Sequence, residues 1–170
     1  MDLADRSVDT VIEDDRWDAF GLPPIAARAV RATLLDRGLV PGLYSLCLMA
    51  CDDARITGLN ASFRGKAQPT NVLSWPSDER AAEQDGAEPA PPEQGDSEDP
   101  AELGDIAIAW ETCAREADEQ GKTMEAHVTH LVVHATLHLL GYDHMREQDA
   151  ALMENAERRI LATFGISDPY

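Results

Sequence analysis

A 26-residue segment in the middle of the chain limits the possible folds most strongly, because it cannot contribute to a core. Residues 77–102 contain ten acidic residues, one basic residue, four prolines and two glycines, and they contain no Val, Ile, Leu or aromatic side chain. Such a segment cannot bury enough apolar surface to offset the entropy lost on ordering it. We therefore expect a disordered acidic loop at about 77–102; a regulatory or partner-binding segment is the alternative. The core has to come from the residues on either side.

The rest of the chain has the composition of one ordinary domain. Its 170 residues match a domain of typical size, and 44% hydrophobic residues suffice for a single core. The longest apolar run, residues 43–51, is far shorter than the roughly 18 residues of a membrane span. Three cysteines and an N-terminus without an apolar run fit a reducing compartment. We expect a single domain over residues 1–170 that is cytoplasmic and has no membrane partner.

The distribution of charge matters more than its sum. The net charge is −18, and half of it lies in residues 77–102. Residues 19–76 are the only net positive stretch, and they include Arg55, Arg64 and Lys66. Phosphate backbones bind to lysine and arginine. The acidity of the whole chain therefore does not exclude a nucleic-acid partner.

The hydrophobic pattern on both sides of the acidic segment predicts strands and helices of ordinary length. Strands are expected over residues 7–13, 43–51, 71–75 and 103–110, the first of them at a sheet edge. Helices are expected over residues 23–37, 54–63, 111–120, 124–140 and 147–164. We predict an α+β fold in which a small mixed sheet of about four strands packs with helices. The pattern does not fix which strands run parallel.

All five histidines lie between residues 127 and 144, and three of them have the spacing of a metal site. His134 and His138 are four residues apart on an apolar helix, so both rings project from one face. Gly141 ends that helix and lets the chain return, which brings His144 toward the same point. Three imidazoles at about 2.0–2.1 Å from one ion leave a fourth position for water, as in catalytic zinc sites. We predict one Zn²⁺ ion on a zincin-like helix, although three imidazoles also accept nickel, cobalt or copper.

The other polar residues nearby have more ordinary interpretations. His130 lies one turn before His134 and either supports a ligand or is a core histidine, whereas His127 fits an ordinary helix start. Zinc peptidases place a glutamate beside the first histidine of this spacing, and here that position is Ala135, which disfavours peptide hydrolysis. The nearest acid, Asp143, is a candidate catalytic residue that could orient a ring or accept a proton.

Three motifs stand out along the chain. The histidine motif reads HATLHLLGYDH over residues 134–144. A second motif reads LNASFRGKAQPTNVLSWP over residues 59–76, and a third reads LGDIAI over residues 103–108. Together they resemble the YbeY family of bacterial endoribonucleases that mature ribosomal RNA, with Ala135 where the family usually has glycine. The closing helix, with Met153, Glu154 and Glu157, is also similar. The resemblance covers residues 6–164, and the acidic segment is longer than the family pattern leads us to expect.

The resemblance implies an activity and a set of site residues. It implies three zinc ligands, His134, His138 and His144. It also implies that Arg64 acts in RNA cleavage, which suits a guanidinium that can hold a phosphate with two hydrogen bonds and offset charge in the transition state. Lys66 is a second candidate for substrate binding.

The implied function is a zinc-dependent endoribonuclease specific for single-stranded RNA. Its role would be the 3′-end maturation of small-subunit ribosomal RNA and ribosome quality control. Zinc would lower the pKa of a bound water toward 7 for attack on the phosphodiester. The expected partners are ribosomal RNA precursors and small-subunit ribosomal proteins.

Two alternatives stay open. The first is a ribosome-assembly factor that binds RNA, holds a structural zinc and catalyses nothing. The second is a general metallohydrolase for small esters or amides. The acidity of the chain has two explanations as well: ribosomal proteins deliver the substrate, or the acidic loop keeps non-specific RNA away from a small cationic groove.

Overall fold

The computed structural model describes residues 7–170 and contains four strands and six helices within them. In chain order they are β1 (Val8–Ile12), α1 (Asp15–Phe20), α2 (Leu22–Asp36), β2 (Tyr44–Cys51), α3 (Asp53–Arg64), β3 (Val72–Pro76), β4 (Ala101–Ala109), α4 (Trp110–Glu119), α5 (Met124–Leu139) and α6 (Glu147–Ala162). The predicted α+β class, the four strands and the five longer helices are confirmed.

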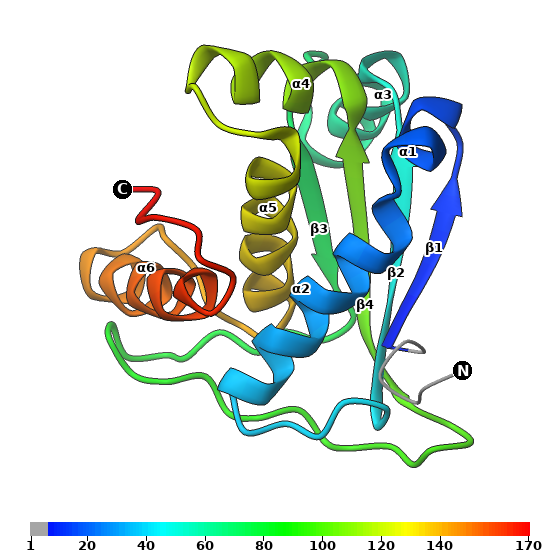
Figure 1. Ribbon diagram of the computed structural model, residues 1–170. Coiled ribbons are helices and arrows are strands. Elements are labelled where there is room, and N and C mark those ends of the chain that lie inside the picture. Colours follow the sequence, from blue (N-terminus) through cyan, green and yellow to red (C-terminus); the bar gives the residue numbers. More distant parts are fainter. Residues whose placement is uncertain (1–6) are drawn as a thin grey trace.

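The four strands form one mixed sheet in the order β1-β2-β4-β3. Strand β2 pairs in parallel with both β1 and β4, and β3 pairs antiparallel with β4. The strand predicted over residues 7–13 therefore does lie at an edge, and β3 forms the opposite edge. Figure 1 shows α2 and α5 in front of this sheet, with α6 packed outside them.

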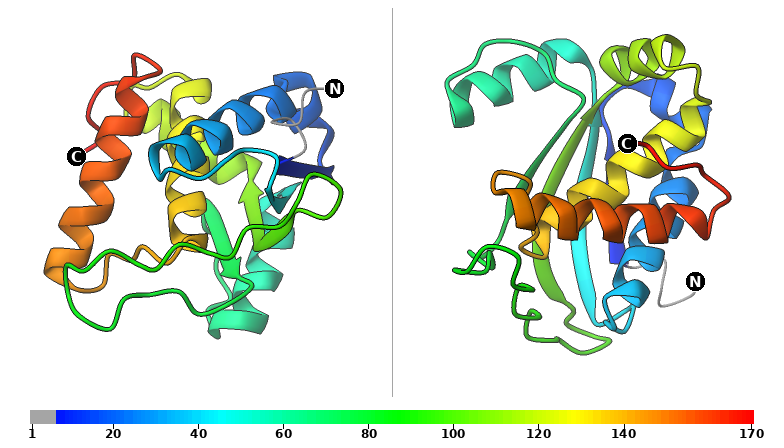
Figure 2. Two further views of the ribbon diagram at one scale, coloured as in Figure 1. Left: turned by 90° about the horizontal axis from the view of Figure 1, so that it is seen from below. Right: turned by 90° about the vertical axis from the view of Figure 1, so that its left-hand side faces the viewer.

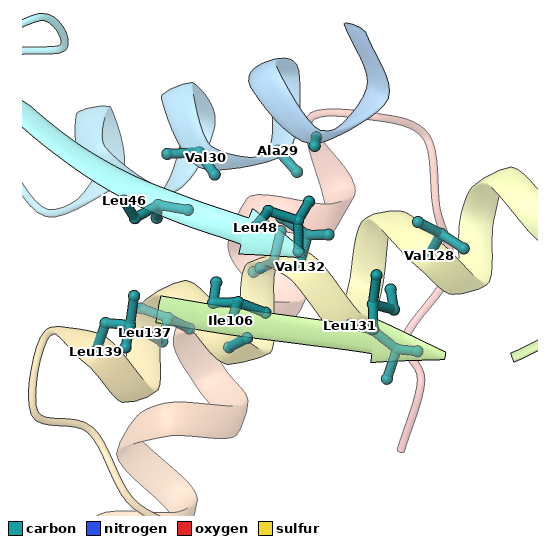
Figure 3. Close-up of a cluster of buried hydrophobic side chains, with 14 of the residues drawn as sticks. Ala29, Val30, Leu46, Leu48, Ile106, Val128, Leu131, Val132, Leu137 and Leu139 are labelled. Atoms are coloured by element: carbon teal, nitrogen blue, oxygen red, sulfur yellow. The ribbon is translucent and has the colours of Figure 1, made fainter. Parts of the chain in front are cut away.

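One face of the sheet carries the main core. Alternate residues of β2 and β4, such as Leu48 and Ile106, point to this face and are almost completely buried. They pack against the apolar stripes of α2 and α5, including Val30 and Val132 (Figure 3). Each such aliphatic side chain contributes about 1.5–3 kcal/mol when it is fully buried. The long helix that carries the histidines is therefore fixed rigidly against the sheet.

Among the helices of residues 7–170, α3 is the one that covers the opposite face, as the right-hand view of Figure 2 shows. A smaller cluster holds this helix, and it includes Cys51, Ile56 and Leu73. Asp52 caps the start of α3 by accepting a hydrogen bond from the Arg55 amide at 2.8 Å. This places the last residue of α3, Arg64, beside the edge strand β3.

The short helix α1 was not predicted, because six residues are too few to show a helical period. Asp14 caps it, and Gly21 ends it in the left-handed conformation. Its Trp17 is fully buried and donates an indole hydrogen bond to the Cys51 carbonyl at 2.9 Å. The helix thus brings a large side chain into the core directly after β1.

The acidic segment connects the antiparallel neighbours β3 and β4, and residues 77–100 form no helix or strand. It touches the body of the protein at several points. The Arg80 guanidinium donates to the carbonyls of Leu103 and Leu139 at 3.2 and 2.9 Å, and the Gly95 amide donates to the Leu43 carbonyl at 3.1 Å. Disorder between these contacts stays a prediction.

Candidate active site

Helix α5 presents three histidines, four residues apart, toward strand β3 and helix α6. Thr123 caps the helix by accepting a hydrogen bond from the Ala126 amide at 3.1 Å. The face that points to the sheet is apolar and buried, whereas His130, His134 and His138 are only partly buried. Each of these rings therefore has one side supported by protein and one side near solvent.

A buried glutamate on α6 supports His134. Glu157 has no exposed surface, and its Oε1 lies 2.7 Å from His134 Nδ1 and 3.3 Å from His130 Nε2. Tyr170 donates its hydroxyl proton to the other carboxylate oxygen of Glu157. Burial alone would raise the pKa of Glu157, but these contacts outweigh burial and bring it to about 2. An ionised Glu157 therefore fixes the His134 ring, leaving its Nε2 free for a ligand.

A hydroxyl on the edge strand supports His138. Ser74 Oγ lies 2.6 Å from His138 Nδ1, which again leaves Nε2 free. Burial lowers the pKa of His138 and so favours the neutral imidazole, the form that binds metal ions. Both histidines of the predicted pair thus have the supporting hydrogen bond that metal-binding histidines usually make.

The turn after α5 brings the third histidine back to the pair. Gly141 has a φ of 103°, and a Cβ at this position would lie 2.5 Å from the Arg80 carbonyl oxygen. Only glycine fits here. The Asp143 side chain then accepts a hydrogen bond from the His144 amide at 2.7 Å. The ring of His144 lies 5.4 Å from that of His134, measured between centroids.

The three predicted metal ligands, His134, His138 and His144, line one cavity together with Arg64. The cavity has a volume of about 320 Å³, and its walls come from α3, β3, α5, the turn after α5 and the last residue of the chain. Its lining residues are Arg64, Asn71, Val72, Ser74, His130, Leu131, His134, His138, His144 and Tyr170. The Arg64 side chain is exposed and forms no hydrogen bond or ion pair with any described residue. Its guanidinium is therefore available to an anion in the cavity.

The donor chemistry of the cavity fits a divalent metal ion. His134 and His138 each keep a free Nε2, and His144 joins them from the turn. Within residues 7–170, however, no three His, Cys, Asp or Glu side chains are already drawn together as a metal cluster. The closing of the three rings around one ion stays a prediction.

Two predicted residues lie outside this cavity. Asp143 lines a neighbouring hollow together with His138 and Arg80, and its carboxylate faces the backbone of its own turn. Lys66 is exposed in the loop after α3 and does not line the cavity either. The geometry therefore supports Arg64 as a site residue more directly than it supports these two.

The remaining two histidines have different surroundings. His127 is buried, and its Nε2 lies 3.0 Å from Glu116 Oε1, which also accepts a hydrogen bond from Asn71 at 2.9 Å. This arrangement links α4 and α5 to Asn71, the residue before β3 in the cavity wall, and makes His127 more than an ordinary helix-start residue. His130 lines the cavity; its Nε2 keeps the ionic contact with Glu157 at 3.3 Å, which lacks hydrogen-bond geometry, and its Nδ1 has no partner within residues 7–170.

The family of the chain follows from comparison with known sequences. The model of the family described as "Endoribonuclease YbeY" matches residues 13–165. The chain belongs to the YbeY family. A YbeY relative from Ruegeria pomeroyi is 57% identical over 164 residues, covering 96% of this chain and 98% of the relative. Another from Cereibacter sphaeroides is 60% identical over 163 residues, with the same two coverages. Both bear the name Endoribonuclease YbeY, so the sequence resemblance and the predicted endoribonuclease activity are confirmed.

A solved structure has a fold similar to that of this chain. The solution structure of TM1509 from Thermotoga maritima matches with a TM-score of 0.54 and 19% identity, covering 95% of this chain and 97% of the other. This likeness concerns the fold alone. No helix within residues 7–170 is both long and apolar enough to span a bilayer.

Proposed function

We propose that this endoribonuclease depends on zinc and cleaves single-stranded RNA. The observation that carries the proposal is the cavity in which Arg64 meets His134, His138 and His144, in a chain whose family is named for endoribonucleases. Three imidazoles and one unpaired guanidinium suit the hydrolysis of a phosphodiester better than that of a neutral ester or amide.

Some residues of the cavity would bind the RNA phosphate, and others hold the histidine rings in position. Arg64 would hold the scissile phosphate through two hydrogen bonds and offset the charge that builds on it during the reaction. Glu157 and Ser74 contact the Nδ1 atoms of His134 and His138, which would leave both Nε2 atoms available to a common ligand. Zn²⁺ held by the three histidines would supply an acidified water and positive charge beside the phosphate.

The identity of the group that moves the proton is part of the proposal. Asp143 is one residue from His144 and is a candidate for this role, although its carboxylate accepts a hydrogen bond from the His144 amide. To act, it would have to release that hydrogen bond and turn toward the cavity. Lys66 would contact the RNA backbone outside the cavity.

The proposed cellular role is maturation of the small-subunit ribosomal RNA 3′ end and ribosome quality control in the cytoplasm. A chain with a net charge of −18 has little long-range attraction for RNA. We therefore propose that small-subunit ribosomal proteins bring the RNA to the site and supply the missing affinity.

The decisive experiment is cleavage of an end-labelled, single-stranded ribosomal RNA precursor fragment. The wild-type protein is compared with His138→Ala and Arg64→Ala, and with Arg31→Ala as a control at another exposed arginine. We expect cleavage to be lost in the first two variants and kept in the control. The metal content of each preparation is measured by mass spectrometry, and His138→Ala should lose its zinc.

Contaminating ribonucleases are the main hazard, and identical purification of all four proteins controls for them. If all four preparations cut equally, the activity belongs to a contaminant and the proposal fails. If His138→Ala loses zinc and unfolds while Arg64→Ala still cuts, the metal is structural and Arg64 is not part of the reaction.

A further inference from the structure

The aromatic side chains of this protein are few and unevenly placed. The chain has nine Phe, Trp and Tyr residues, all within the described part. Only two of them are exposed, Phe63 at 65% and Tyr170 at 53%. Tyr170 lines the cavity, and Phe63 precedes Arg64, which lines it too. Tyr170 is therefore part of the candidate active site, and Phe63 is the chain neighbour of one of its lining residues.

The two exposed rings differ in what already contacts them. The Tyr170 hydroxyl is bonded to Glu157, its ring meets that of His130 at 5.9 Å between centroids, and the Arg158 guanidinium lies 5.4 Å from its centre. Phe63 has one aromatic neighbour, Trp75, at 5.3 Å between centroids in an edge-on arrangement. Most of the Phe63 ring is thus open to solvent.

The position of this pair follows from the alternation of strand β3. Ser74 points to the α5 side and supports His138, so the next residue, Trp75, points to the α3 side. There it meets Phe63, the neighbour of Arg64 on α3. The pair and the cavity therefore lie on the two sides of one edge strand, and Arg64, which follows Phe63 in α3, lines the cavity.

An exposed aromatic ring beside a phosphate-binding arginine is a typical arrangement for holding a single strand. A nucleobase stacks on such a ring whatever its sequence, because every base has a flat π-face. Double-stranded RNA keeps its bases inside the helix, where this contact is impossible. Trp75 packs against one side of the ring, and α3 ends at the Gly65 cap two residues later.

We propose that Phe63, supported by Trp75, is a stacking site for a base of the RNA strand next to the phosphate at Arg64. The contact holds the strand across the edge of β3 and favours unpaired substrates. This inference rests on the proposed placement of the scissile phosphate in the cavity. It assigns Phe63 to substrate binding and gives it no part in the bond-breaking step.

The test compares Phe63→Leu with Phe63→Tyr in steady-state cleavage of a fluorescein-labelled single-stranded RNA oligonucleotide. Leucine keeps an apolar side chain but removes the ring, and tyrosine keeps the ring. We expect KM to rise about tenfold in Phe63→Leu with kcat within about twofold, and we expect Phe63→Tyr to match the wild type. Leu35→Ala, at an exposed apolar residue of α2, is the control and should change neither constant.

A second set of substrates identifies the stacked base. Oligonucleotides that lack one base at successive positions around the cleaved bond are compared in the wild type and in Phe63→Leu. At one position the missing base should weaken wild-type binding about tenfold and should weaken Phe63→Leu no further. Equal KM values for Phe63→Leu and wild type would overturn the proposal, as would equal losses in both proteins at every position.

The same variants separate this inference from the proposed function. Binding of the labelled oligonucleotide is also measured by fluorescence anisotropy, which needs no cleavage. If no RNA is cleaved but Phe63→Leu still binds about tenfold more weakly, the enzymatic proposal fails and the stacking site stands. If Arg64→Ala cleaves normally while the stacked position is found, only the placement of the phosphate is wrong. Thermal melting checks that Phe63→Leu is folded, as expected for a largely exposed ring.

Discussion

The two sides of the candidate active site are built in opposite ways. On the α5–α6 side, Glu157 is completely buried and contacts His130, His134 and Tyr170. On the α3 side, Arg64 and Phe63 are exposed, and Arg64 has no partner among the described residues. The polar groups on the α5–α6 side bind one another and so hold the histidine rings in place. The side chains on the α3 side have no such partners and are available to a substrate. Substitutions on the first side should disturb folding and metal binding, and those on the second should disturb the handling of RNA alone.

Glu157→Gln should have the largest effect, because it removes the buried charge that supports two histidines. Breaking such a buried charged contact costs about 3 kcal/mol of unfolding free energy, and loss of the group that orients a ligand lowers metal affinity about 10–100-fold. Urea unfolding and zinc competition with a chelator measure the two effects. Glu154→Gln on the same helix is the matched control, since its side chain makes no hydrogen bond or ion pair within the described residues. Coincident unfolding curves for Glu157→Gln and wild type would contradict this interpretation.

Arg64→Ala should distinguish the two sides most clearly, because it should lower the rate of RNA cleavage and leave the stability of the fold unchanged. Losing a guanidinium that stabilises transition-state charge should lower kcat/KM about 100-fold, while the unfolding free energy should stay within about 0.5 kcal/mol of the wild type. Arg64→Lys should recover only part of the rate, because an ammonium cannot form the paired hydrogen bonds of a guanidinium. A clear loss of stability in Arg64→Ala would mean that the α3 side is also structural.

Ser74→Ala should have an intermediate effect, since Ser74 supports His138 from the edge strand. We expect zinc affinity to fall about tenfold with little change in stability. Ser74→Thr keeps the hydroxyl and serves as the matched comparison. If Ser74→Ala binds zinc as tightly as the wild type, the orientation of His138 depends on α5 packing instead.

We expect the smallest effect from Asp36→Asn, in a cluster of charged side chains outside the site. This cluster shows how much of the protein's stability in acid depends on residues that are not part of the site. The Arg159 guanidinium lies 2.6 Å from Asp36 Oδ1, and the Arg37 guanidinium lies 2.6 Å from Oδ2. Burial alone would raise the pKa of Asp36, but these two arginines outweigh burial and lower it. The stability that Asp36 provides is therefore present above the unfolded pKa of about 4 and is lost as the pH falls through the lower folded value. Asp36→Asn should cost about 1 kcal/mol at pH 7 in urea unfolding, and the difference should shrink in strong acid.

Most of the fold could be predicted from the sequence because its elements carry strong periodic signals. Strands β2 and β4 show apolar alternation or apolar runs, and α2 and α3 have recognisable starts and ends. The direction of the strands could not be predicted, since alternation determines which face a residue occupies and is the same in parallel and antiparallel sheets. The six residues of α1 were missed because they span less than two turns.

The histidine cluster could be located from spacing alone, but its supports could not. Glu157 is 23 residues from His134 in the chain and on a different helix. One signal for it was present: Met153, Ala156, Ile160 and Leu161 form a buried stripe on α6, and Glu157 lies on the same stripe. A charged residue on an apolar stripe needs a buried partner. Ser74 gave no such signal, because a serine on an edge strand is ordinary.

The antiparallel pairing of β3 and β4 has a consequence for how this protein can change. Two neighbouring antiparallel strands need a connection of only two to five residues, so the acidic segment is an enlarged hairpin loop. Its length has little effect on stability, since each doubling of a flexible loop costs only about 0.6 kcal/mol. The Ser77 amide already continues the ladder to the Leu103 carbonyl at 2.9 Å, so the strand register is set before the loop begins. Provided that Arg80 keeps its contacts with Leu139 and the Gly141 turn, the rest of this loop can therefore change its length and its charge without disturbing the histidines, and it is the natural place to insert a fluorescent reporter.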